Sequence, residues 1–150
     1  MVSAIKKELT LKKEILKDKK IKTIYFGGGT PSLLNHEELK LIMDEIFNIY
    51  DCTEISEVTL EANPDDVNQT NIESWKQSGV NRISLGVQSF FNDDLKQMNR
   101  AHNGDQAHHA IELLRKNDIT NISIDFMFSR EVVPKTNTLP TSPRLQIPIS

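Results

Sequence analysis

The residues best suited to chemistry are three consecutive glycines, Gly27–Gly29, in the stretch TIYFGGGTPSLL. The chain has six glycines, so half of them stand in this one segment. Glycine has no Cβ atom, can adopt positive φ, and lets a ligand reach backbone N–H and C=O groups. The segment lacks the Lys-Ser/Thr ending of a P-loop and is not a GxGxxG fingerprint. A ligand-binding loop, a phosphate cradle of another type and a tight turn without a ligand are all compatible with it.

Three further polar residues stand near the carboxyl ends of predicted strands. Glu61 lies late in SEVTLEANP, Gln88 late in NRISLGVQSF, and Asp125 late in ITNISIDFMF. In parallel α/β folds, the carboxyl ends of the strands form the edge that holds the ligand. We therefore expect these three side chains to converge with the glycine loop on one site.

The elements that must position these residues alternate between strand and helix. Periodicity predicts strands over 22–27, 56–64, 81–90 and 119–128, and helices over 3–19, 35–50, 68–79, 92–99 and 105–117. Asn35 and Glu38 have the spacing of a capping box at the start of one helix. Regular alternation of this kind predicts an α/β fold with a parallel sheet.

The predicted strands have two different faces, because successive side chains point to opposite sides. One face is large and apolar, with Ile24, Phe26, Val58, Leu60, Ile83, Leu85, Val87, Ile122, Ile124, Phe126 and Phe128. The other is small or polar, with Thr23, Tyr25, Gly27, Thr59, Glu61, Ser84, Gly86, Gln88, Ser123 and Asp125. A fully buried parallel strand should be apolar on both faces. We expect a curved sheet whose concave face lines a cavity; an open sheet with one bare face is the alternative.

Composition limits the class of protein. The 150 residues are 37% hydrophobic and 26% charged with a net charge of −3, which suits one soluble domain and gives no basic footprint for nucleic acid. No apolar run approaches the roughly 18 residues of a membrane span. The amino-terminal segment is too charged for a secretory signal, so we expect a cytoplasmic protein. The single cysteine, Cys52, excludes an internal disulfide.

The end of the chain differs in kind from the rest. Residues 130–150 hold four of the six prolines, Pro134, Pro140, Pro143 and Pro148. Proline removes a backbone donor and favours extended conformations. We expect one domain over 1–129 and an irregular, disordered tail over 130–150 with no packed element.

Four segments in fixed order carry a resemblance over about residues 5–129. YFGGGTPSLL, LEANPDD, GVNRISLGVQSF and MNRAH resemble the radical S-adenosylmethionine proteins around oxygen-independent coproporphyrinogen III dehydrogenase. The EANP, GVQSF and Arg-x-His forms are more similar to the heme chaperone branch of that family. The resemblance implies a partial parallel (β/α) barrel, here of about four strands, that holds S-adenosylmethionine beside a [4Fe–4S] cluster. For the complete protein it implies heme or porphyrin and heme-accepting proteins as partners.

The resemblance also implies which residues contact the cofactor: Gly28, Gly29 and Thr30 at its methionyl part, and further Glu61, Gln88, Arg100 and Asp125. The chemistry is suitable, because carboxylates accept from an ammonium or from ribose hydroxyls, and a guanidinium pairs with a carboxylate.

Three of these residues, Glu61, Arg100 and Asp125, also have a purely structural interpretation. Glu61 could cap a loop, Asp125 could pair with Arg82, and Arg100 could be a surface residue. His102, which completes the Arg-x-His form, could lie at the cofactor mouth or be an ordinary loop histidine.

The chain departs from the family pattern at the stretch after Phe128, where SREVVPKTNT is unlike the family's continuation, and at the cluster ligands. The family holds its cluster through Cys-x-x-x-Cys-x-x-Cys, whereas Cys52 in IYDCTEIS matches no ligand position. Three thiolates are needed to hold the cluster. We therefore predict no catalytic residue, no metal ligand and no radical activity in this chain, and interpret it as a heme chaperone fragment truncated at both ends. The alternatives are a fragment of the dehydrogenase, which decarboxylates propionates in porphyrin biosynthesis, and a cluster-free nucleotide- or phosphate-binding module.

Overall fold

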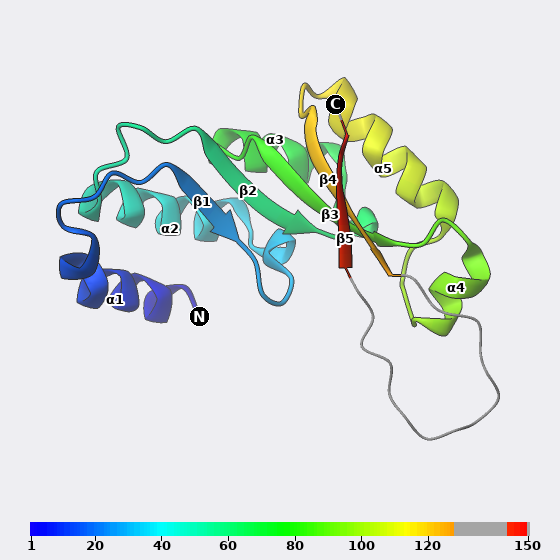
Figure 1. Ribbon diagram of the computed structural model, residues 1–150, viewed down its shortest axis with the longest axis horizontal. Coiled ribbons are helices and arrows are strands. Elements are labelled where there is room, and N and C mark those ends of the chain that lie inside the picture. The colour runs from blue at the N-terminus through cyan, green and yellow to red at the C-terminus, as the bar shows by residue number, and fades with distance from the viewer. Residues whose placement is uncertain (128–143, 150) are drawn as a thin grey trace, which may run out of the picture.

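A five-stranded sheet is the centre of the computed structural model, which describes residues 1–127 and 144–149 (Figure 1). The strands follow one another in chain order as β1 (Thr23–Phe26), β2 (Glu57–Ala62), β3 (Arg82–Gln88), β4 (Asn121–Met127) and β5 (Arg144–Ile149). The first four are parallel, and β5 is antiparallel to β4. The predicted α/β class with about four parallel strands is confirmed.

The helices alternate with the strands as the sequence predicts. They are α1 (Val2–Lys12), α2 (His36–Ile49), α3 (Gln69–Gln77), α4 (Asn92–Gln97) and α5 (Gly104–Lys116), with short 3-10 turns η1 (Lys13–Leu16), η2 (Pro31–Leu33) and η3 (Pro64–Asp66). The predicted capping box of Asn35 and Glu38 starts α2. The predicted helix over 3–19 is shorter than expected. Its α-helical part ends at Lys12, and a 3-10 turn follows it to Leu16.

The core lies on one face of the sheet, between the strands and α2, α3 and α5. From the strands it takes the predicted apolar face, with Ile24, Val58, Leu60, Ile83, Leu85, Val87, Ile122 and Ile124 all buried. The helices contribute Leu39, Ile42, Trp75, Ala107 and Leu114, among others. Burial of one face in this way fixes the register of each strand, because a slip of one residue would send its apolar side chains to the wrong side.

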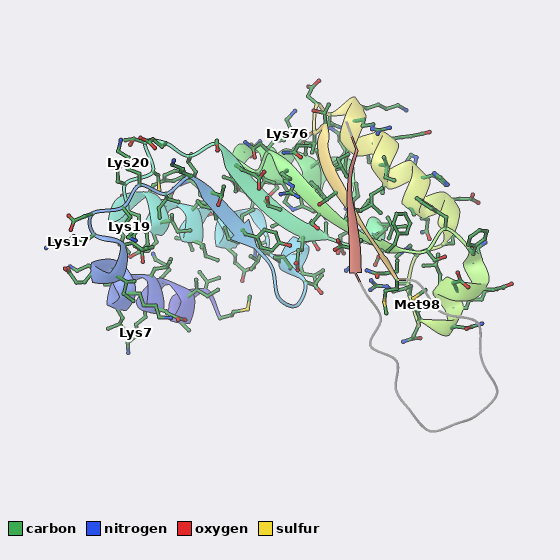
Figure 2. The ribbon with its side chains drawn as sticks, in the orientation of Figure 1. Lys7, Lys17, Lys19, Lys20, Lys76 and Met98 are labelled. Atoms are coloured by element: carbon green, nitrogen blue, oxygen red, sulfur yellow. The ribbon has the colours of Figure 1, made fainter. Side chains whose placement is uncertain are left out.

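The amino-terminal helix α1 packs on α2 and keeps its lysines in solvent. The Tyr50 hydroxyl donates to the Leu9 carbonyl at 2.9 Å, and Lys6 pairs with Glu45 at 3.1 Å. Lys7, Lys17, Lys19 and Lys20 are exposed around α1 and the segment after it (Figure 2). Among residues 1–127 and 144–149, no helix combines the length and apolarity that crossing a bilayer requires.

Residues 144–149 differ from the expected tail without packed elements, because they form β5 along the edge of β4. The apolar residues of RLQIPI alternate, which is the pattern of a strand. Pro148 is tolerated because an edge strand has backbone groups that need no partner in the sheet. Residues 128–143 and 150 lie outside the described residues, and the division into 1–129 and 130–150 stays a prediction.

Candidate functional site

A pocket of about 210 Å³ lies at the carboxyl ends of β1 to β4. It is lined by Gly29, Thr30, Pro31, Glu61, Ala62, Asn63, Ser84, Gly86, Gln88, Arg100 and Asp125. Six of the seven predicted site residues are in this lining. The seventh, Gly28, adjoins it and donates its N–H to Oε2 of Glu61 at 3.1 Å. The structure therefore brings together side chains separated by almost a hundred residues of sequence.

The three glycines of the loop are required for two different physical reasons. Gly28 and Gly29 have φ of +83° and +86°, in the left-handed region where other residues are strained. A Cβ atom on either would meet nothing within 4 Å, so their backbone faces open space. At Gly27 the reason is steric, because a Cβ would lie 2.5 Å from Cε1 of Tyr25 and 2.9 Å from Oε1 of Glu61.

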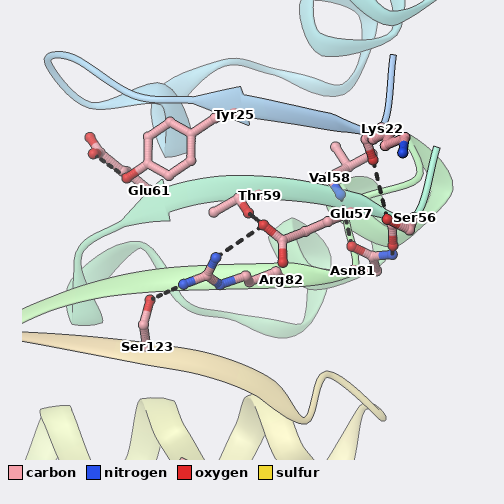
Figure 3. A network of polar contacts seen from close by, with 10 residues as sticks. All are labelled: Lys22, Tyr25, Ser56, Glu57, Val58, Thr59, Glu61, Asn81, Arg82 and Ser123. Carbon is pink, nitrogen blue, oxygen red and sulfur yellow. Dashed lines mark hydrogen bonds and ion pairs between the residues drawn. The ribbon is translucent and has the colours of Figure 1, made fainter. Parts of the chain in front are cut away.

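Glu61 is fixed at the pocket rim by two hydrogen bonds. Its Oε1 accepts from the Tyr25 hydroxyl at 2.7 Å (Figure 3), and its Oε2 accepts from the Gly28 N–H. Partial burial, followed by the hydrogen bond to Glu61, raises the pKa of the Tyr25 hydroxyl above its ordinary value. The carboxylate therefore joins β2 to the glycine loop while still facing the pocket.

Asp125 lines the pocket and has one carboxylate oxygen without a partner among the described residues. Its Oδ2 accepts from the Ser84 hydroxyl at 3.4 Å. Its Oδ1 is buried and has no hydrogen-bond partner within the part of the chain that the structure describes. A buried polar atom without a partner costs about 1–3 kcal/mol, so it favours a ligand that donates a hydrogen bond there.

The end of β3 is distorted where it meets the pocket. Gln88 has φ of +69°, and the register with β4 shifts between Leu85 and Gln88. A left-handed conformation is uncommon for a residue other than glycine, and such backbone is concentrated at functional sites. Gly86 forms the floor, where an added Cβ would lie 3.2 Å from Nε2 of Gln88 and 3.5 Å from Nη2 of Arg100.

Arg100 reaches the pocket from the turn after α4. Asn99 adopts φ of +51°, and the Arg100 N–H donates to the Leu95 carbonyl at 2.9 Å, which closes the end of the helix. Among the ion pairs of residues 1–127, none involves the Arg100 guanidinium. The group is thus available to an anionic part of a ligand.

The amino-terminal half of the same polar face is filled by internal contacts, as Figure 3 shows. Arg82 donates to Glu57 at 3.0 Å and to the Ser123 hydroxyl at 3.4 Å, and the Thr59 hydroxyl donates to Glu57 at 2.9 Å. The hydrogen bond from Arg82 lowers the pKa of Glu57 below its ordinary value. Arg82 therefore pairs with Glu57, and the alternative in which it pairs with Asp125 is wrong.

Sequence reasoning left several neighbours of the pocket unassigned. Asn63 stands in the quoted LEANPDD segment but was not expected at the site, and Ser84 and Gly86 were assigned only to the polar face. His102 does not line the pocket: it is buried, with Nε2 2.9 Å from the Val87 carbonyl and Nδ1 3.6 Å from Asp65. Its contacts hold together two segments that border the site.

The residues of this chain do not fit an iron–sulfur cluster. Cys52 lies between α2 and β2, at the amino ends of the strands and therefore at the edge opposite the pocket. Partial burial raises the pKa of its thiol, which disfavours the thiolate that would bind iron. Within the described ranges, no three His, Cys, Asp or Glu side chains are grouped closely enough to hold a metal ion.

Comparison with known proteins gives the chain a family. The model of the radical SAM superfamily matches residues 5–130. The chain is 42% identical over 110 residues to the heme chaperone HemW of Lactococcus lactis, which is 73% of this chain and 29% of that protein. It is 41% identical over 109 residues to HemW of Bacillus subtilis, which is 72% of this chain and 29% of that protein.

A solved structure gives the same fold. Coproporphyrinogen III oxidase of Escherichia coli, described as a radical SAM enzyme, is similar with a TM-score of 0.74 over 83% of this chain and 29% of that one. At 21% identity this likeness shows the fold alone. The chain spans less than a third of the length of these relatives.

Proposed function

Since the chain belongs to the radical SAM superfamily, we propose that its pocket binds S-adenosylmethionine and that it forms this part of a heme chaperone. The observation that carries the proposal is the convergence of the glycine loop with Glu61, Gln88, Arg100 and Asp125 on one polar pocket. The buried, unpaired Oδ1 of Asp125 supports it, because a bound ligand would supply the missing donor.

The charges of the pocket suit this cofactor better than a phosphate. S-Adenosylmethionine carries an ammonium, a sulfonium and a carboxylate, for a net charge of +1. Glu61 and Asp125 with Arg100 give the pocket lining a net charge of −1, so the two are complementary. A nucleotide phosphate carries several negative charges and would meet two carboxylates. The charge balance therefore weighs against the phosphate-binding module.

Each group of the cofactor has a suitable partner. Glu61, fixed against the glycine loop, would accept from the methionyl ammonium, and Arg100 would pair with the methionyl carboxylate. Asp125 and Gln88 would bind the ribose hydroxyls. Gly28 and Gly29 would let the methionyl group lie directly on the backbone.

S-Adenosylmethionine supplies radical chemistry in this superfamily when a [4Fe–4S] cluster delivers an electron to it. The residues of this chain give such a cluster no ligand set. We therefore propose that these 150 residues bind the cofactor without converting it.

The heme chaperone branch is favoured by the HemW proteins of several bacteria, which are 35–42% identical to the chain. An oxygen-independent coproporphyrinogen-III oxidase-like protein of Bacillus subtilis is 34% identical, and the likeness to coproporphyrinogen III oxidase of Escherichia coli, at 21% identity, is one of fold. Heme binding, transfer to heme-accepting proteins and a cytoplasmic location are part of this proposal. A longer protein that includes these residues would support it by transferring heme, and would contradict it by forming protoporphyrinogen instead.

Titration calorimetry of the purified chain tests cofactor binding. We expect S-adenosylmethionine to bind and ATP to bind at least tenfold more weakly. Glu61→Gln should weaken binding, whereas Lys7→Gln, on the exposed face of α1, should not. Tighter binding of ATP, or binding of S-adenosylmethionine that is indifferent to Glu61→Gln, would defeat the proposal.

A further inference from the structure

Tyr25 has no part in the site predicted from the sequence, yet the structure joins it to that site. Its side chain is 54% exposed on β1, the strand that leads into the glycine loop. It lines a second, largely apolar cavity of about 620 Å³ bordered by α1, β1, α2 and the glycine loop, and its hydroxyl reaches Glu61 in the polar pocket. Figure 3 shows the ring lying over β2 with its hydroxyl at the carboxylate.

The arrangement constrains the carboxylate from two sides. The Tyr25 hydroxyl holds Oε1 at 2.7 Å while the Gly28 N–H holds Oε2 at 3.1 Å. A glutamate side chain has several rotatable bonds, and its terminal torsion has only broad preferences. With one of these donors removed, the carboxylate would be free to turn away from the glycine loop.

The packing around Gly27 shows that this contact is built into the loop. A Cβ at Gly27 would clash with both the ring of Tyr25 and the carboxylate of Glu61. The φ of Gly27 is outside the positive region occupied by Gly28 and Gly29, so conformation does not require glycine there. Glycine at this position therefore serves to leave room for the contact between Tyr25 and Glu61.

We propose that Tyr25 is a positioning residue that holds the Glu61 carboxylate against the glycine loop, in the orientation that accepts the ammonium of S-adenosylmethionine. This inference rests on the proposed function. Tyr25 does not contact the ammonium; it acts through Glu61. The raised pKa of Tyr25 is consistent with a hydroxyl that keeps its proton to donate to an anion.

The test compares two ligands on one variant. Tyr25→Phe keeps the ring and removes only the hydroxyl. 5′-Methylthioadenosine has the nucleoside and the sulfur of the cofactor but no ammonium and no carboxylate. By calorimetry, Tyr25→Phe should weaken S-adenosylmethionine between about twofold and tenfold, the range expected for one hydrogen bond, and leave 5′-methylthioadenosine unchanged. A structural defect would weaken both ligands equally, and that outcome would overturn the proposal, as would unchanged affinity for both.

Tyr50→Phe is the matched control, because the chain has two tyrosines and the Tyr50 hydroxyl donates to the Leu9 carbonyl, away from the pocket. Its affinity for both ligands should equal that of the unmodified chain. If the unmodified chain binds no S-adenosylmethionine, the proposed function fails and this inference fails with it.

A second measurement needs no ligand. It distinguishes failure of the positioning role of Tyr25 from failure of S-adenosylmethionine binding. In the Tyr50→Phe background, tyrosinate absorbance reports Tyr25 alone. Adding Glu61→Gln should lower the pKa of Tyr25, because it removes the carboxylate that accepts its hydrogen bond, while the more weakly acting charge of Asp125 stays the same in both proteins. An identical titration curve with and without Glu61→Gln would show that the two groups do not interact in solution, and would overturn the positioning role even if S-adenosylmethionine binds.

Discussion

Replacing Gly86 by alanine should stabilise the fold and impair the site. Gly86 lies within β3, and its φ is outside the positive region, so alanine fits the backbone. A glycine-to-alanine change at a compatible position stabilises by about 0.4–1 kcal/mol, because the unfolded chain has less freedom to lose. The added methyl would lie 3.2 Å from Nε2 of Gln88, the end of a flexible side chain that can move aside. We therefore expect a midpoint of thermal unfolding raised by about 1–4 °C.

The same methyl group should weaken ligand binding. It would stand on the floor of the pocket among Gln88, Arg100 and Asn63, within 3.5 Å of an atom of each. Gln88 and Arg100 are two of the proposed cofactor contacts, and either would have to shift. Overpacking a well-fitted site costs about 1–3 kcal/mol, which corresponds to a loss of affinity between about fivefold and about 150-fold. Circular dichroism melting and titration calorimetry on the same preparation measure both effects.

Gly79→Ala is the matched control for Gly86→Ala. Gly79 has φ of +86° at the end of α3, and a Cβ there would make only an ordinary contact of 3.9 Å with Met43. It should destabilise by about 1–2 kcal/mol through the left-handed backbone, and leave affinity for S-adenosylmethionine unchanged. Equal affinity of the unmodified chain and Gly86→Ala would refute the assignment of the pocket. A strong loss of stability in Gly86→Ala would refute the argument that Gln88 can move.

Three further outcomes follow from individual contacts. Trp75→Ala should lower the free energy of unfolding by about 3–5 kcal/mol in urea titrations, because Trp75 is 1% exposed, whereas Phe47→Ala at 49% exposure should change it by less than about 1 kcal/mol. Asp125→Asn should leave stability unchanged or raise it by about 1 kcal/mol, since it removes the negative charge of a carboxylate with an unpaired buried oxygen, yet lower affinity for S-adenosylmethionine in calorimetry; a loss of stability would contradict this reasoning. Because Arg82 lowers the pKa of Glu57 below its ordinary 4.5, the folded state is favoured above that pH and loses this contribution as the pH falls through the lowered pKa. The unfolding free energy of Glu57→Gln should therefore fall less steeply than that of the unmodified chain below about pH 4.5, and parallel curves would count against the ion pair.

The sequence allowed the parallel sheet and the convergence at its carboxyl edge to be predicted, because both follow from local periodicity. The alternation of β3, in RISLGVQ, already separates a buried face from a polar one. The capping box at Asn35 likewise depends on residues three apart. Both features involve residues only a few positions apart in the chain, so a short segment of sequence is enough to predict them.

Features that depend on register or on a distant partner could not be predicted in this way. In the register of β2 and β3, Arg82 lies opposite Thr59, and Glu57 is two residues from Thr59 on the same face of β2. This register lets Arg82 pair with Glu57, and it cannot be read from the sequence. The left-handed backbone of Gln88 arises where β3 and β4 shift relative to each other. The pairing of β5 with β4 could not be predicted, because the residue pattern of each strand does not show which other strand it pairs with.

The two ends of the polar face of the sheet differ in whether their polar side chains have hydrogen-bond partners within the described part of the protein. At the amino ends, Arg82 supplies donors to Glu57 and Ser123, so the polar side chains there satisfy one another. At the carboxyl ends, the described residues leave a buried carboxylate oxygen of Asp125 without a donor and the Arg100 guanidinium without an ion pair. Buried polar groups are stable only when paired, so the unpaired Asp125 oxygen is a cost that the fold alone does not offset. Arg100 is half-buried, and its guanidinium lines the pocket without an ion pair among the described residues. A ligand that brings a donor for Asp125 and a carboxylate for Arg100 would suit both groups, so a strand face that is polar throughout can be structural at one end and a binding site at the other.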